Sequence, residues 1–321
     1  MIRVPAPPGL APVLRTLPYA KRRSPLRDPA PDPGLFGPGS VTWRVMREPT
    51  LILGAGSALL LQAANPKVAQ GAIDHSNYAT DPYGRLERTV EWVTVVCFGT
   101  TQEARRATRN INRLHRRVSG SMPAPNGTPG VPPGQPYSAS DRDLLRWVHA
   151  SFVHSMLAAH DALVGGLTDA DRDGFVREWD AVAALMGLSA RNGWSSAAAL
   201  SGYIDAEVAS GRALPGPGSR AVAEAVLHPP VPTALLRPAM TALAFVSCGL
   251  LPAPLRRAYG ITWTPAHAAV HRGVRLSLRT LRVALPERLR TSSVHKRAMA
   301  RAEDAAPGRT PHSASPRAGT V

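Results

Sequence analysis

The chain has 321 residues, of which 44% are hydrophobic and only 5% aromatic. This length supports one large or two small domains with a sizeable core, and the richness in Ala, Leu and Arg favours helices. Cys97 and Cys248 are too few for a disulfide framework. No CxxC or CxxCH motif and no Cys/His zinc cluster is present, so the sequence does not support covalently attached haem or a structural zinc site.

The formal net charge of +16 is concentrated near the C-terminus. Residues 252–321 contain 13 Lys or Arg and three Asp or Glu. No helix-turn-helix, zinc-finger or RNA-binding aromatic motif accompanies this charge, which disfavours nucleic-acid binding. Contact of the basic C-terminal segment with an anionic membrane surface stays open as an alternative.

No segment reads as a membrane span or an export signal. The longest apolar runs, 51–64 and 239–251, are shorter than the roughly 20 residues that a transmembrane helix needs. Arg22-Arg23 is followed by Pro and charged residues rather than by an apolar stretch. We therefore expect a cytoplasmic protein, or one peripheral to a membrane.

The distribution of Pro, Gly and helix-capping residues divides the chain into three parts. Residues 1–38 are a Pro-rich irregular arm, 39–290 an all-α domain and 291–321 a basic disordered tail. A Gly/Pro loop spans 119–136, and no strand alternation is visible. The predicted helices are 50–64, 66–75, 85–98, 102–118 (capped by Thr101), 140–164 (capped by Ser140), 169–186 (capped by Thr168 with Asp171), 196–211, 221–227, 232–250 and 266–285.

The helix that follows the loop places His149 on an apolar face. At 100° per residue, this face also carries Leu145, Phe152, Val153, Met156 and Leu163. A buried imidazole needs a backbone carbonyl, a polar neighbour or a metal as its partner. By pattern alone, a hydrogen-bonded core histidine is the more frequent outcome. His154 points to the opposite side, and His160 lies roughly 16 Å further along the axis.

Two further histidines allow two interpretations each. His115 ends the Arg-rich helix, where it is either a cation at the helix C-terminus or a residue facing the pocket of His149. His75 is likewise a helix-end or a pocket residue. The run Leu53-Gly-Ala-Gly-Ser57 allows close helix packing or close approach of a flat ligand.

Ordered motifs resemble one family over residues 39–290. They are Trp43-Arg-Val-Met-Arg-Glu-Pro, Gly56-Ser-Ala-Leu-Leu-Leu-Gln-Ala-Ala-Asn-Pro66 with Asp74-His-Ser76, Asp81-Pro-Tyr-Gly-Arg-Leu-Glu-Arg-Thr89 with Phe98-Gly-Thr100, Leu114-His-Arg-Arg-Val-Ser-Gly120, Tyr137-Ser-Ala-Ser-Asp and Leu144-Leu-Arg-Trp-Val-His-Ala150. In this order they resemble the oxygenase MpaB / rubber oxygenase (latex clearing protein) catalytic-domain family.

The resemblance implies an all-α, globin-like bundle around a pocket for non-covalent haem b, with dioxygen as co-substrate. Arg146-Trp-Val-His149 matches the family's Arg-x-x-His motif, which carries the iron-ligand role to His149. The resemblance also places a polar cluster upstream, at Arg113, His115, Arg116 and Arg117, of which Arg113, His115 and Arg117 are the expected catalytic residues. The lysine that the rubber oxygenases can place on the distal side is missing, which puts His115 in that position.

Arginine also binds carboxylates well, so Arg85, Arg88 and Arg146 are the expected partners of the haem propionates. The resulting hypothesis is a haem b-dependent oxygenase that acts on a hydrophobic or isoprenoid-like small molecule. The missing export signal disfavours rubber itself as substrate. The alternative is a non-catalytic helical protein that binds haem or lipid, or acts as a sensor.

Overall fold

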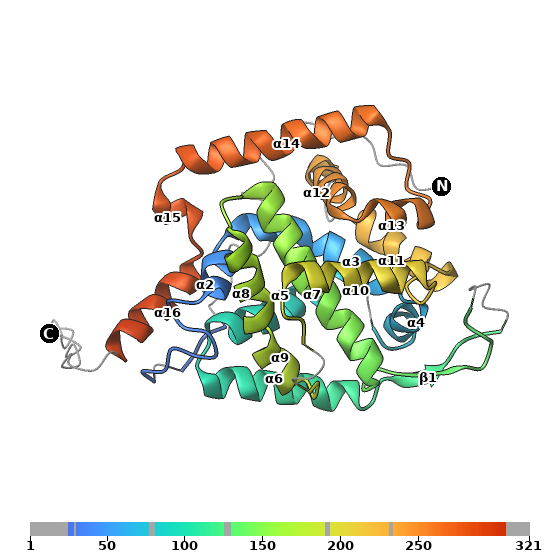
Figure 1. The fold of residues 1–321 in the computed structure, drawn as a ribbon, viewed down its shortest axis with the longest axis horizontal. Coiled ribbons are helices and arrows are strands. Elements are labelled where there is room, and N and C mark those ends of the chain that lie inside the picture. Colours follow the sequence, from blue (N-terminus) through green and yellow to red (C-terminus); the bar gives the residue numbers. More distant parts are fainter. Residues whose placement is uncertain are drawn as a thin grey trace, which may run out of the picture.

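Helices α3 (Ala55–Ala63) and α7 (Arg142–Leu163) cross at the centre of the structure, a computed structural model (Figure 1). It describes residues 25–28, 30–76, 81–124, 130–189, 193–230 and 234–305. The two helices approach closely at Gly54, where an added Cβ would lie 2.6 Å from the Cβ of Ala159. Only glycine fits at this contact. The glycine-rich run 53–57 thus serves helix packing.

The other elements surround this central pair. They are α2 (Val41–Met46), η2 (Pro49–Gly54), α4 (Pro66–His75), α5 (Pro82–Phe98), α6 (Thr101–His115), α8 (Asp169–Glu178), α9 (Asp180–Leu185), α10 (Ala197–Ala209), α11 (Pro217–Leu227), η4 (Ala234–Leu236), α12 (Arg237–Leu250), α13 (Ala253–Ala258), α14 (Pro265–Ala284), α15 (Glu287–Arg290) and α16 (Ser293–Asp304).

The all-α prediction is confirmed, with one small exception. Strands β1 (Ser119–Ser121) and β2 (Pro136–Ser138) pair antiparallel at the base of the Gly/Pro loop, with Gly120 opposite Tyr137. Three residues each were too short to show an alternating pattern in the sequence. The hairpin delivers the chain directly into α7.

Several helices begin or end at residues other than those predicted from the sequence. Asp141 rather than Ser140 caps α7, and Thr100 rather than Thr101 caps α6. The helix predicted over 169–186 is broken at Trp179 into α8 and α9. The predicted helix 50–64 begins with the 3-10 turn η2. Each predicted segment was correct as a region, whereas its ends depend on contacts with neighbouring elements.

The tail predicted from residue 291 begins too early. Residues 293–304 form α16, which buries Val294, His295, Ala298 and Arg301. The Arg301 guanidinium donates to the carbonyl oxygens of Asp32 (2.8 Å) and Phe98 (2.6 Å). These bonds hold α16 against the body and against the N-terminal arm. Residues 1–24 and 306–321 lie outside the described part of the chain.

Helix α14 runs along one outer edge of the molecule (orange, top of Figure 1) and is fixed by its arginines. Arg279 Nε donates to the carbonyl of Ala162 (3.0 Å) and its Nη2 to that of Asp161. These carbonyls belong to the last turn of α7, which lacks intrahelical donors. One turn further on, Arg282 forms a two-pronged ion pair with the buried Glu48.

Thr168 is the N-cap of α8, as predicted, and substituting it tests how much this cap stabilises the fold. Its hydroxyl accepts from the Asp171 N–H (3.2 Å), and the Asp171 carboxylate accepts from the Thr168 N–H (3.0 Å). Thr168→Ala is therefore expected to lower the free energy of unfolding by about 1 kcal/mol. Urea unfolding followed by circular dichroism measures it. Thr168→Ser keeps the hydroxyl and should stay near wild type, and equal losses in both variants would contradict the capping role.

Candidate functional site

His149 reaches the interior because of how α7 begins. The Asp141 carboxylate accepts from the N–H groups of Asp143 (2.8 Å) and Leu144 (3.3 Å). Asp143 adds a negative charge to the first turn, where the helix dipole favours it. With the start fixed, His149 lies two turns into the helix, on the side away from the contact with α3.

Aromatic rings surround the His149 imidazole. Trp194 stacks on it with ring centroids 6.1 Å apart and an interplanar angle of 12°, and Trp179 lies 6.4 Å away at 46°. No hydrogen bond joins its ring nitrogens to another described residue. Burial lowers the pKa of His149 to about 4, so the ring is neutral at pH 7. A neutral imidazole keeps a lone pair for a proton or a metal ion.

Arg146 lies one turn before His149, among the same rings. Its guanidinium carbon is 5.0 Å from the ring centroid of Trp194 and 4.6 Å from that of Tyr203. Among the described residues, the buried Nε of Arg146 and Nε1 of Trp179 have no hydrogen-bond partner. Buried donors are normally satisfied, so an acceptor on a bound group would fit beside them.

The polar cluster expected from α6 is not gathered in space. His115 turns inward, and burial lowers its pKa. Its buried Nδ1 has no hydrogen-bond partner within the described part of the chain. Arg113 and Arg117, in contrast, are exposed, and Arg113 makes a long bond to Asn110 (3.5 Å). Of the three residues, His115 alone faces the interior. No ring contact or hydrogen bond joins it to His149 in the described structure.

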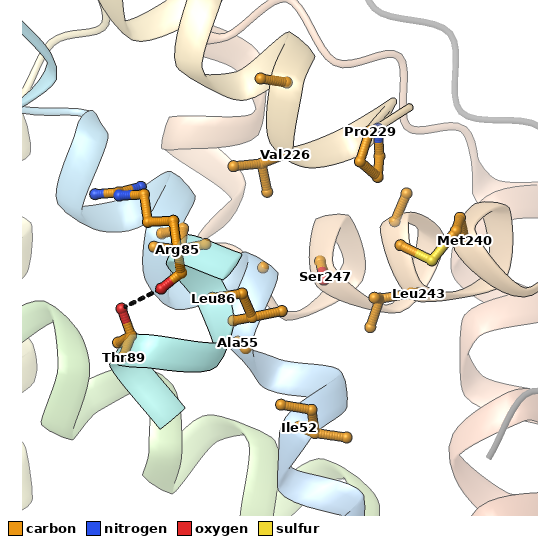
Figure 2. Close-up of a pocket in the computed structure, with 14 residues that line it drawn as sticks. Ile52, Ala55, Arg85, Leu86, Thr89, Val226, Pro229, Met240, Leu243 and Ser247 are labelled. Atoms are coloured by element: carbon orange, nitrogen blue, oxygen red, sulfur yellow. Dashed lines mark hydrogen bonds between the residues drawn. The ribbon is translucent and has the colours of Figure 1, made fainter. Parts of the chain in front are cut away.

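Arg85 and Arg88 lie on α5, away from the aromatic neighbours of His149. Arg88 is exposed and forms an ion pair with Asp81 at 3.4 Å. Arg85 lines an apolar cavity between η2, α3, α5, α11 and α12, at the end opposite Met240 and Pro229 (Figure 2). The geometry therefore leaves Arg146, and neither Arg85 nor Arg88, beside His149.

The apolar cavity has an accessible volume of about 70 Å³ and is partly open to solvent. Its two hydroxyl groups are turned onto the backbone: Thr89 Oγ donates to the Arg85 carbonyl (3.0 Å) and Ser247 Oγ to that of Leu53 (3.4 Å). Apart from Arg85, the wall is thus largely apolar. Helix α7 contributes none of its lining, so the cavity and His149 occupy different parts of the fold. The lining residues are Ile52, Ala55, Gly56, Leu59, Arg85, Leu86, Thr89, Ala225, Val226, Pro229, Met240, Leu243, Ala244 and Ser247.

The remaining histidines have other neighbours. His75 Nε2 bonds to the Ser119 carbonyl (3.0 Å) beside the edge of Tyr137, which makes it a helix-end residue. His160 is fully enclosed near Glu48, at the other end of α7. Among the described residues, no group of three or more His, Cys, Asp or Glu side chains is placed to share a metal ion. A metal at His149 would have to bring most of its ligands with it.

Sequence reasoning missed the aromatic surroundings of His149. Trp179, Trp194 and Tyr203 come from three segments downstream, and nothing in their local patterns ties them to α7. The available signal was the small number of large aromatic residues, since the chain contains six Trp and six Tyr. Each of these side chains buries a large apolar surface, so they are candidates for the wall of an internal site.

An all-helical domain in which a neutral histidine lies among aromatic rings belongs to the class of helical proteins with an internal histidine site. His271 and His295 also have aromatic neighbours, on α14 and α16. A family model described as "ER-bound oxygenase mpaB/B'/Rubber oxygenase, catalytic domain" matches residues 43–283. The chain belongs to this oxygenase family. The match spans α2 to nearly the end of α14 and so contains both His149 and the apolar cavity. Neither a search of curated proteins nor one of solved structures found a match.

Proposed function

We propose that this protein is a haem b-dependent oxygenase that uses dioxygen on a hydrophobic substrate, with His149 as the iron ligand. The observation that carries the proposal is the state of His149: enclosed by rings, neutral at pH 7, and without a hydrogen bond to any described residue. Haem needs only one or two axial ligands from the protein, which suits a lone histidine.

The residues beside His149 fit such a group. The unpartnered Nε of Arg146 offers a donor to a propionate carboxylate. Trp179 and Trp194 supply an apolar wall that keeps water from the imidazole. When bound, haem would supply an iron centre at which dioxygen is activated. We propose His115 as the polar residue on the other side, because burial lowers its pKa and its Nδ1 has no hydrogen-bond partner among the described residues.

The chain's own task in this proposal is to hold His149 unprotonated and oriented. Burial achieves the first, because protonation of the imidazole inside the ring cluster is disfavoured. Stacking on Trp194 restricts the ring plane. Arg146 keeps its charge one turn away, held between Trp194 and Tyr203. Arg113 and Arg117 are exposed, so we do not retain them as catalytic residues.

The test is the absorption spectrum of the protein reconstituted with haemin, oxidised and reduced. We expect a Soret band with one haem per chain and, for His149→Ala, loss of haem affinity by at least about tenfold. His154→Ala removes a histidine of the same helix that points to the other side, and it should keep the haem. A wild-type protein that takes up no haemin, or a His149→Ala variant that keeps its full haem content, would overturn the proposal.

The apolar cavity favours a second candidate function, a non-catalytic protein that binds an apolar ligand. Its wall is largely apolar, as in sites for apolar small molecules. Ala225→Phe would fill part of the cavity and should abolish displacement of a fluorescent apolar probe by long-chain alkenes. Oxygen consumption with the same alkenes separates the candidates: consumption supports the oxygenase, whereas binding without consumption supports the carrier.

A further inference from the structure

The outward face of α14 is unusual for an exposed helix. All 20 of its residues are described, and among the exposed ones Arg272 is the only charged side chain. Four large apolar side chains project to solvent: Val270 (41% exposed), Leu276 (57%), Leu281 (44%) and Val283 (72%). Solvent-facing helix surfaces normally carry charged and polar residues. This one presents an apolar face instead.

The four large side chains form two rows on that face. At 100° per residue, Leu276 and Val283 lie along one side, and Val270 and Leu281 along the other. Between the rows lie small residues: Ala266, Ala269, Gly273, Ser277, Thr280 and Ala284. A 20-residue helix is roughly 30 Å long, so the face is an extended, shallow apolar strip. Leu289, in the short helix α15 that follows, is also exposed (57%).

The charged residues of α14 mostly point the other way. Arg275 and Arg279 donate to carbonyls at the end of α7, and Arg282 is paired with Glu48. The helix is therefore bound to the body through its basic side and cannot turn its apolar side inward. Its exposed leucines and valines are held outward by these bonds, along an edge that no other described element covers (Figure 1).

We infer that this strip, defined by Val270, Leu276, Leu281 and Val283, docks the protein on an anionic lipid bilayer. Charge complementarity selects this partner: Arg272 is exposed beside the strip on α14, Arg288 is exposed in α15, and residues 252–321 contain 13 basic against three acidic residues. A helix lying in the interface buries its apolar face while its arginines meet lipid phosphates. No helix among the described residues is long and apolar enough to cross a bilayer, so the contact is in the plane of the surface.

A second copy of the chain is a poorer fit to the same strip. Pairing two such faces would bring together two molecules that each have a net charge of +16 and an exposed arginine, Arg272, beside the contact. Like charges across an interface oppose association. An anionic surface instead gains from this arginine.

Vesicle flotation with the full-length protein tests the inference. Wild type should bind vesicles that contain phosphatidylglycerol and bind phosphatidylcholine vesicles more weakly. Leu276→Glu with Val283→Glu should raise the lipid concentration for half-binding at least about tenfold, because two apolar side chains are lost from the contact and two negative charges are added. Both positions are exposed, so the fold should persist, and circular dichroism checks this.

Leu114→Glu is the matched control. Leu114 is also exposed (55%) but lies on α6, on the opposite side of the molecule from α14 (Figure 1), and this variant should bind vesicles like wild type. Equal binding by the double variant and wild type would overturn the inference, as would a wild type that floats with neither vesicle. A wild-type dimer by light scattering that the double variant abolishes, without vesicle binding, would assign the strip to a second copy.

Discussion

Replacing Arg282 with alanine is expected to lower the free energy of unfolding by about 3–5 kcal/mol. The Arg282 guanidinium donates to both oxygens of Glu48, at 2.8 and 2.5 Å, and the Glu48 side chain is only 2% exposed. Without Arg282, a carboxylate stays buried with a single longer contact to Arg47 at 3.7 Å. An under-compensated buried charge is among the most destabilising defects that a point substitution produces.

The free energies of unfolding of three variants distinguish destabilisation by an unpaired buried charge from stabilisation by the ion pair itself. Glu48→Leu combined with Arg282→Leu removes both charges and should recover most of the loss, because apolar replacements of buried pairs are often tolerated. Arg288→Ala removes an exposed arginine and should stay within about 0.5 kcal/mol of wild type. If Arg282→Ala were as stable as Arg288→Ala, the pair would have no structural role.

The Glu48–Arg282 pair also shows where sequence reasoning ends. The helices themselves were predictable, because caps such as Thr168 and apolar periodicity are local signals. The two partners of this pair are 234 residues apart, and nothing near either one identifies the other. The basic C-terminal region was expected to have a disordered tail, whereas α14 and α16 direct arginines into carbonyl oxygens and onto Glu48. Composition gives the number of charged residues but not whether their side chains point to solvent or into the protein.

The candidate site was likewise predictable in its local features and not in its contacts between distant segments. The helix of His149 and its apolar face followed from spacing, while its neighbours Trp179, Trp194 and Tyr203 did not. At the end of α6, Arg113 is exposed whereas His115, two residues on, points inward, and Arg117 is exposed in the turn that follows the helix. Residues two apart on a helix face nearly opposite directions. A cluster in sequence was therefore not a cluster in space.

Acidification is expected to destabilise the fold between about pH 6.5 and pH 4. Burial lowers the pKa of His160 and His271 to about 4 in the folded protein, against an ordinary value of about 6.5 in the unfolded chain. Between these values the unfolded state binds more protons, so stability falls as the pH falls. Each histidine adds a slope of about 1.4 kcal/mol per pH unit. The contribution is fully present above pH 6.5 and fully lost below pH 4.

Urea unfolding at pH 7.5, 6.5, 5.5 and 4.5 measures this dependence. His160→Asn keeps a polar side chain in place of a titrating one, so its unfolding free energy should fall less steeply with acid than that of wild type. A stability that does not change across this range in wild type, or an unchanged slope in His160→Asn, would contradict the assignment.

The pH dependence should also couple to the ion pair. Burial dominates the lowered pKa of His160, while Glu48 and Asp161 raise it and the charges of Arg282 and Arg44 lower it further. Arg282→Ala removes one of the charges that oppose protonation and leaves the negative charge of Glu48 behind. The pKa of His160 should then rise towards its unfolded value, narrowing the pH range over which that histidine affects stability. The variant should thus be less stable at pH 7.5 but lose less of its remaining stability on acidification, a non-additive result typical of groups that share one charged cluster.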